Sequence, residues 1–250
     1  NNVRGEAADH GTHVAGIIAA KRNNDLGMDG VAPNVKVMCL RAVPDGDEYD
    51  KDIALAIMYA VENGARVINM SFGKTWSPNS DMVGKAIKMA EDKGVLMVHA
   101  AGNDASNNDK TTHYPTRYNA EGHEATNFLV VGASSSLNDA ALVADFSNYG
   151  RKAVDVLAPG VDIYSLEPDN KYKDNSGTSM AAPVTSGVAA MLLSYFPELT
   201  GAELKTILME STMKHPKLKV MLPASADSKP KKTKLKKLCV TGGVINGYEA

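Results

Sequence analysis

The sequence predicts an α/β protein whose central sheet is mostly parallel and carries helices on both faces. Short apolar runs are typical of buried strands, and stretches with apolar residues at helical spacing lie between several of them. Strands that alternate with helices in this way form parallel sheets covered on both sides. Polar, glycine-bearing stretches follow some of the strand-like runs, at the sheet edge where such proteins bind ligands. The expected strands are 35–40, 66–70, 95–98, 128–132 and 154–157.

Length and composition indicate one globular domain over residues 1–250. Of the 250 residues 44% are hydrophobic and the formal net charge is −2, so we expect one sizeable core and no nucleic-acid partner. No apolar run approaches the roughly 20 residues of a membrane-spanning helix. Because the sequence begins with Asn1 rather than Met, we expect an amino-terminally truncated or processed form of a longer protein, with no signal peptide visible.

The first elements in chain order are a helix, a loop and a strand. The helix is expected to start near His10 and to enter the core, and the polar loop 23–33 to follow it. The run 35–40 predicts a buried strand, in which Cys39 would be an inert buried thiol. The spacing of Cys39 and Cys239 does not decide whether they pair.

Two further helices are expected between the next strands. Residues 51–63 carry apolar side chains at helical spacing, with Asp50 as the cap and Gly64 as the stop. The second of these helices covers residues 80–93 and ends at Gly94.

The carboxyl-terminal third predicts two helices and a basic stretch. A buried helix follows Ser179, and Pro183 is tolerated if it lies in the first turn. Residues 200–211 predict a helix that Thr200 and Glu203 begin with a capping box. The lysine-rich stretch 214–237 suggests a solvated surface loop inserted before the closing segment, or alternatively a patch for nucleic acid or acidic lipid.

Ser179 has the sequence context of a nucleophile. Gly177 permits a tight turn, and the N–H groups at the start of the next helix have no intrahelical partner and carry partial positive charge. A serine at that position has an anion site beside its own hydroxyl, which acyl transfer needs. Taken alone, the same residues could form a loop with an ordinary helix cap.

Three stretches, in this order, resemble the subtilisin-like serine peptidases, or subtilases. They are Asp9-His10-Gly11-Thr12-His13-Val14-Ala15-Gly16, Ala100-Ala101-Gly102-Asn103 and Gly177-Thr178-Ser179-Met180-Ala181-Ala182-Pro183. The resemblance extends from about Asp9 to Tyr195. It implies a subtilisin-like three-layer fold and a serine endopeptidase that hydrolyses peptide bonds in proteins.

The resemblance also implies roles for individual residues. Ser179 would be the nucleophile and His10 the general base, and the Asn103 side chain and the Ser179 N–H would hold the oxyanion. The expected substrate-binding residues form two groups. Ser71, Phe72 and Gly73 would pair with extended substrate, and Ala100, Ala101 and Gly102 would form one wall of the primary specificity pocket.

The triad aspartate is expected to lie upstream of this chain. Asp9 adjoins His10, but successive side chains on a helix point in different directions, so Asp9 is badly placed to bond the ring. In subtilases the aspartate ends a strand that precedes the histidine in the sequence. Residues 1–8 contain no aspartate, so we expect the catalytic carboxylate before residue 1.

The resemblance implies no cofactor for the chemistry and no catalytic metal. The loop 23–33, with Asn24 among its ligands, is a candidate site for structural calcium, and an ordinary loop is the alternative. His99 is expected to be a satisfied core or near-site histidine. The resemblance also implies protein or peptide substrates and a secreted or extracytoplasmic location.

Two other functions stay open from the sequence. One is a catalytically inactive subtilase-like domain that binds peptide or serves as structural support. The other is an esterase or amidase that uses the same site on small substrates.

Overall fold

The computed structural model describes residues 8–43, 48–224 and 230–250, and within them a mostly parallel sheet forms the centre. Its strands are β1 (Val67–Met70), β2 (Leu96–Ala100), β3 (Phe128–Ser134), β4 (Val156–Pro159), β7 (Met213–Lys214) and β10 (Gly243–Val244). Their order is β1-β2-β3-β4-β10-β7, and only the β10–β7 pair is antiparallel. The predicted mostly parallel sheet is confirmed.

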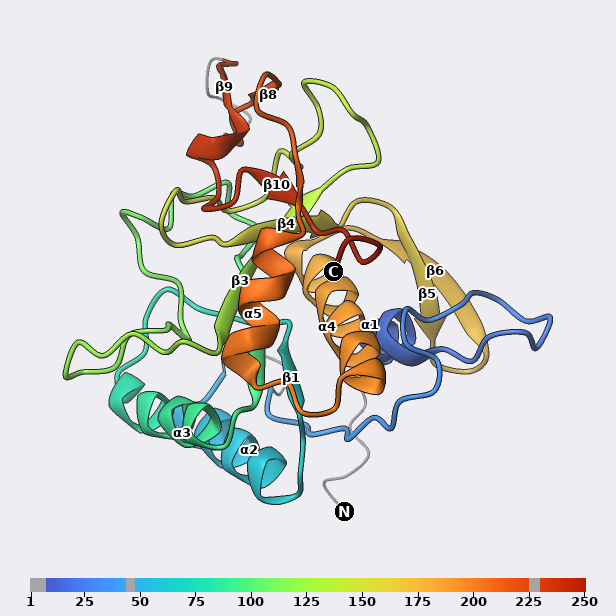
Figure 1. Ribbon diagram of the computed structural model, residues 1–250, viewed down its shortest axis with the longest axis vertical. Helices are drawn as coiled ribbons and strands as arrows, with labels where there is room; N and C mark the ends of the chain where they lie inside the picture. Colours follow the sequence, from blue (N-terminus) through green and yellow to red (C-terminus); the bar gives the residue numbers. More distant parts are fainter. Residues whose placement is uncertain (1–7, 44–47, 225–229) are drawn as a thin grey trace.

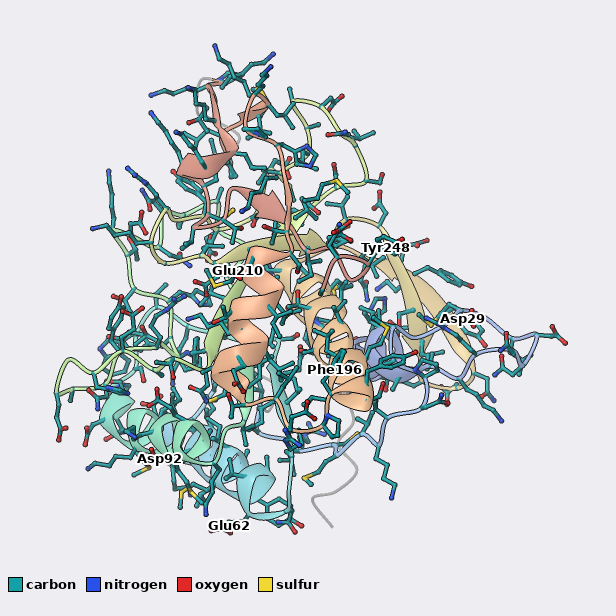
Figure 2. The ribbon with its side chains drawn as sticks, viewed as in Figure 1. Asp29, Glu62, Asp92, Phe196, Glu210 and Tyr248 are labelled. Atoms are coloured by element: carbon teal, nitrogen blue, oxygen red, sulfur yellow. The ribbon has the colours of Figure 1, made fainter. Side chains whose placement is uncertain are left out.

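Helices cover both faces of this sheet. They are α1 (Asp9–Ala19), α2 (Asp50–Glu62), α3 (Ser80–Asp92), α4 (Thr178–Tyr195) and α5 (Gly201–Glu210). Figure 1 shows α2 and α3 together on one side of the strands, and α4 and α5 on the other. Glu62 and Asp92, labelled in Figure 2, mark the carboxyl ends of the α2–α3 pair. Among the described residues, no helix combines the length and apolar character needed to cross a membrane.

A hydrophobic core lies on each face of the sheet, because successive side chains along a strand point to opposite faces. Met97 and Phe128 pack with residues of α2 and α3 in one core. Leu96, Val98 and Leu129 pack with residues of α4 and α5 in the other. The central strands are buried on both faces, which is the arrangement of a three-layer α/β fold.

Several predicted helix ends are confirmed. Gly64 and Gly94 follow α2 and α3 with φ of +79° and +67°, a left-handed conformation that suits glycine. Thr200 begins α5 with the predicted capping box: its hydroxyl accepts from Glu203 N, and the Glu203 carboxylate accepts from Thr200 N.

The prediction that Asp50 caps α2 is wrong. Asp50 is the first residue of the helix, and its carboxylate makes no cap hydrogen bond. It accepts instead from Ser77 Oγ at 2.7 Å and from Asn79 N at 2.8 Å, and it pairs with Lys74 Nζ at 2.8 Å. The buried carboxylate therefore ties the start of α2 to the connection between β1 and α3.

The predicted buried strand at 35–40 is also wrong. The segment forms no ladder with any described strand, and β1, at the edge of the described sheet, pairs with β2 alone. Without a partner, Val37 and Met38 stay exposed. Cys39 is an exposed free thiol rather than a buried one, whereas Cys239 is free and buried.

Two hairpins lie beside the main sheet. β5 (Ile163–Glu167) and β6 (Lys171–Asn175) form one, which packs against α1. β8 (Lys219–Met221) and β9 (Lys232–Lys234) form the other, followed by a 3-10 turn at Leu235–Lys237. The stretch 214–237 is thus not simply a solvated loop, because Val220 and Leu235 are buried in the core.

Candidate active site

Two loops that follow neighbouring strands meet at the start of α4. Ser71, Phe72 and Gly73 follow β1, and Ala101, Gly102 and Asn103 follow β2, whose last residue is Ala100. Because β1 and β2 are parallel neighbours, both loops start at the carboxyl ends of their strands, on the same side of the sheet. Ser71 Oγ donates to Ser179 O at 2.9 Å, and Gly102 N donates to Thr178 Oγ1 at 3.1 Å. The structure therefore places one predicted substrate-binding residue of each loop, Ser71 and Gly102, against the start of α4, where the predicted nucleophile lies.

Asn103 is held in one orientation by Thr178. Its Oδ1 accepts from Thr178 N at 2.8 Å and from Thr178 Oγ1 at 2.9 Å. A backbone N–H can only donate, so the carboxamide oxygen has to face Thr178 and the Nδ2 amide faces the other way.

The Asn103 amide and the Ser179 N–H flank one small space. A Cβ added to Gly177 would lie 3.5 Å from Asn103 Nδ2 and 3.6 Å from Ser179 N. Neither nitrogen donates a hydrogen bond to another described residue. Two N–H donors that have no partner and flank one space can hold an oxyanion there.

The Ser179 hydroxyl is only weakly tethered. Its Oγ donates to Ser71 O at 3.3 Å, which is long for a bond between two oxygen atoms. Among the described residues it makes no hydrogen bond to His10. Catalytic hydrogen bonds are often long or absent before substrate binds, so the geometry leaves the hydroxyl able to turn.

His10 lies in the first turn of α1, and α1 packs against α4. Partial loss of hydration lowers the pKa of His10 below its ordinary value, and His13 adds to this shift although Asp9 opposes it. The neutral imidazole favoured by this shift is the form that accepts a proton. Within the part of the chain that the structure describes, no carboxylate pairs with the His10 ring.

His13 serves to hold α1 in place. Its ring is buried, and Nε2 donates to Lys173 O at 3.0 Å. The His13 carbonyl accepts from Ser165 Oγ at 2.8 Å. Both bonds join α1 to the β5–β6 hairpin and so fix the helix that carries His10.

Pro183 lies inside α4 rather than in its first turn, so that prediction is wrong. Residue 183 would normally donate to the carbonyl four residues earlier, which is Ser179 O, but proline has no N–H. Ser71 Oγ supplies the missing bond to Ser179 O. Asn69 Nδ2 donates to Ser71 Oγ at 2.9 Å, and Ser186 Oγ donates to Asn69 Oδ1 at 2.9 Å, so α4 and the β1 loop share one polar network.

We expect Ser71→Ala to lower the free energy of unfolding by about 1–3 kcal/mol, because Ser179 O and Asn69 Nδ2 lose their partner. In a Pro183→Ala background the same change should cost about 1 kcal/mol less, because an alanine at position 183 has an N–H that can bond Ser179 O. Chemical denaturation of the two single variants and the double variant measures this coupling. Strictly additive costs would contradict the compensation.

His99 is a satisfied core histidine, as predicted. It is 1% exposed, and Nε2 donates to Phe72 O at 3.0 Å. Burial is the main cause that lowers the pKa of His99 to about 3, and the nearby His113 lowers it further. The His99 imidazole is therefore neutral when it holds the loop after β1, and it is no candidate for proton transfer at neutral pH.

The free energy of unfolding should fall as the pH drops from 6.5 toward 5. The unfolded chain binds a proton at position 99 near its ordinary pKa of 6.5, whereas the folded chain does so only near 3. One such histidine contributes a slope of up to about 1.4 kcal/mol per pH unit. Denaturation across this pH range should give a smaller slope for His99→Gln than for the unaltered protein. Equal slopes would contradict the assignment.

Gly73 and Gly102 face His113, a side chain with no predicted role. A Cβ on either glycine would collide with the His113 ring. The predicted pairing of substrate beside these glycines stays a prediction. The His113 ring already excludes a side chain at Gly73, and at Gly102 the ring does so together with Asn148 Nδ2, which would lie even closer to a Cβ there. Gly73 N also donates to Glu48 Oε1 at 3.0 Å, so a substrate that pairs there has to displace this carboxylate.

Asn148, for which the sequence predicts no role, holds the loop after β2. Its Oδ1 accepts from Asp104 N and Ser106 N, both at 2.9 Å, and Nδ2 donates to Ala101 O at 3.0 Å. These bonds fix the chain on both sides of Asn103.

The structure adds no support for the calcium site that the resemblance implies at the loop 23–33. Asn24 Oδ1 accepts from Leu26 N at 3.1 Å within the loop itself. Among the described residues, no three His, Cys, Asp or Glu side chains group together as metal ligands would. Calcium at this loop stays a prediction.

A serine at a helix start, two free N–H donors beside it and a histidine with a lowered pKa on a packed neighbouring helix form the kind of site that serine hydrolases use. Residues 1–240 match the model of the subtilase family, and the chain belongs to that family.

Known relatives and solved structures agree with this membership. The chain is 44% identical over 187 residues to the thermophilic serine proteinase of Bacillus sp. (strain AK1), covering 74% of the chain and only 43% of that longer relative. It is 37% identical over 198 residues to subtilisin DY of Bacillus licheniformis, covering 78% and 67%. The prenylagaramide maturation protease PagA superposes with a TM-score of 0.76 at 28% identity, covering 99% of the chain and 83% of that structure. Sphericase gives 0.74 at 31%, covering 85% and 72%.

Proposed function

We propose that this domain belongs to a serine endopeptidase that hydrolyses peptide bonds in proteins. The observation that carries the proposal is the space beside Ser179, which Asn103 Nδ2 and Ser179 N both flank with no other partner among the described residues. A serine that merely caps a helix has no need of a second, side-chain donor aimed at the same point. The matched relatives are named as serine proteinases and subtilisins, which supports the same class.

The proposed reaction uses three residues of this chain. Ser179 Oγ forms a bond to the carbonyl carbon of the substrate while His10 accepts the hydroxyl proton. The carbonyl electron pair moves to oxygen, which Asn103 Nδ2 and Ser179 N stabilise. The bond to the amine then breaks as His10 returns the proton to the leaving nitrogen. Water, activated by His10, releases the acyl group from Ser179 by the same steps.

A carboxylate from outside the described residues is proposed to orient His10. No described Asp or Glu pairs with the ring, and an imidazole that becomes an imidazolium during the reaction gains from a carboxylate partner. By the Asp, His, Ser order of subtilases, we propose that this aspartate lies before residue 1 in the parent protein, meaning the full protein that contains this chain. An Asp→Ala series in the parent protein, read by kcat, identifies it.

Protein substrates and a secreted or extracytoplasmic location belong to the same proposal. In it, Ser71, Phe72 and Gly73 pair with the backbone of an extended peptide, and Ala100, Ala101 and Gly102 line the pocket for one side chain. No cofactor is needed for these steps. Calcium at the loop 23–33 would affect stability rather than chemistry.

The test compares the parent protein on a denatured protein and on p-nitrophenyl acetate, beside Ser179→Ala. An endopeptidase produces internal fragments of the denatured protein, and Ser179→Ala abolishes them. Ester hydrolysis with an intact protein substrate would favour the esterase alternative. Peptide binding without turnover of either substrate would favour the inactive binding domain.

A further inference from the structure

The loops after β1 and β2 leave a limited space for the substrate side chain next to the scissile bond. Ser71 O lies 3.3 Å from Ser179 Oγ on one side, and Asn103 flanks the Ser179 N–H on the other. In the proposed function, Ser71 to Gly73 and Ala100 to Gly102 flank the pocket for the side chain of the acyl residue, so this side chain enters the space between the two loops.

The His113 ring fills the space between the two loops. Its Nδ1 would lie 2.7 Å from a Cβ on Gly73, and its Nε2 would lie 2.7 Å from a Cβ on Gly102. The ring thus touches the backbone of both loops at once. Nδ1 is buried without a partner in the described part of the chain, so this edge of the ring faces protein rather than solvent.

Neighbouring groups hold the backbone of His113 and pack against one side of its ring. The adjacent Tyr114 pairs with Lys74 in both directions, with N–O distances of 2.8 and 3.1 Å, which pins the His113 backbone beside the first loop. On the core side the His99 ring lies with its centroid 5.5 Å from that of His113. His99 is itself fixed by Phe72 O and packs on Phe128, with the ring centroids 5.6 Å apart.

We propose that His113 is a specificity-determining residue that makes this pocket shallow, so that the domain accepts small acyl side chains such as alanine and excludes aromatic ones. The proposal rests on the proposed peptidase function. Its physical basis is volume: an aromatic side chain needs the space that the imidazole occupies, and close-packed interiors do not yield such volume without cost. An alanine side chain needs none of it.

The test uses the parent protein and two peptide p-nitroanilides that differ only in the acyl residue, alanine or phenylalanine. The unaltered protein should show the larger kcat/KM for alanine. In His113→Gly the ratio of kcat/KM for phenylalanine to that for alanine should rise by at least about 10-fold, since a pocket enlarged by more than one methylene discriminates at that level. His113→Ser should change the ratio in the same direction, and it keeps the test available if the glycine variant does not fold.

His113→Phe is the matched control, because it keeps an aromatic ring in the space and should retain the preference for alanine. Cleavage of both substrates with the same ratio in His113→Gly, His113→Ser and the unaltered protein would overturn the role of His113 while leaving the peptidase function intact. Failure of the unaltered protein to cleave either substrate would overturn the proposed function, and this inference with it.

Discussion

Ser179→Ala and His10→Ala should each lower kcat by roughly a million-fold, and the double variant should lower it no further. The hydroxyl is a poor nucleophile without a base, and the base has no proton to accept without the hydroxyl, so the two side chains act as a unit. The size of the effect is the one known for subtilisin, and we expect it here because the chain belongs to the same family.

Ser176→Ala is the matched control for these variants. Ser176 lies in the same loop, and its Oγ accepts from Asp162 N at 2.9 Å, away from the proposed oxyanion space. Its kcat should stay close to that of the unaltered protein. Losses that add in the His10 and Ser179 double variant would contradict a shared proton-transfer step.

Asn103→Ala should lower kcat by roughly 100- to 1,000-fold with little change in KM, because the lost donor acts on charge that develops in the transition state. This magnitude also comes from subtilisin. Removing the whole side chain additionally removes the acceptor of the two Thr178 bonds, so Asn103→Ala alone mixes two effects.

Asn103→Asp separates these effects. A carboxylate at position 103 can still accept from Thr178 N and Thr178 Oγ1, but it offers no N–H to the oxyanion. We therefore expect a loss of kcat at least as large as in Asn103→Ala, with a smaller loss of stability. Thr178→Val, which removes only the hydroxyl bonds, should reduce kcat less than either. A fully active Asn103→Asp variant would contradict the assignment of Asn103 Nδ2.

Much of the fold could be predicted because periodicity and helix ends are local properties. The strands β1 to β4 and the capping box at Thr200 lie close to where apolar runs and capping residues placed them. The prediction of a buried strand at 35–40 was wrong because an apolar run forms a strand only where a neighbouring strand supplies hydrogen-bond partners for its backbone. The prediction that Pro183 lies in the first turn was wrong because the serine motif alone decided where the helix was expected to begin. In the structure Pro183 lies deeper in α4, where Ser71 Oγ supplies the bond that the proline cannot make.

The site was predicted from sequence motifs. The site residues that the sequence analysis did not find lie outside these motifs. Asn69, Asn148 and His113 meet the site through partners far away in the sequence, and such pairings arise only when the strands are side by side. His113 in particular follows a polar loop that gives it no distinctive context. Its contact with two glycines from different loops can be found only in the three-dimensional structure.

Labelling of the parent protein with a fluorophosphonate probe tests the central claim most directly, because such probes react only with activated serines. The account predicts one labelled residue, Ser179, located by mass spectrometry of the digested protein, and no label in the Ser179→Ala variant. Absence of label on the folded protein, or label on a different serine, would contradict the claim that Ser179 is the nucleophile.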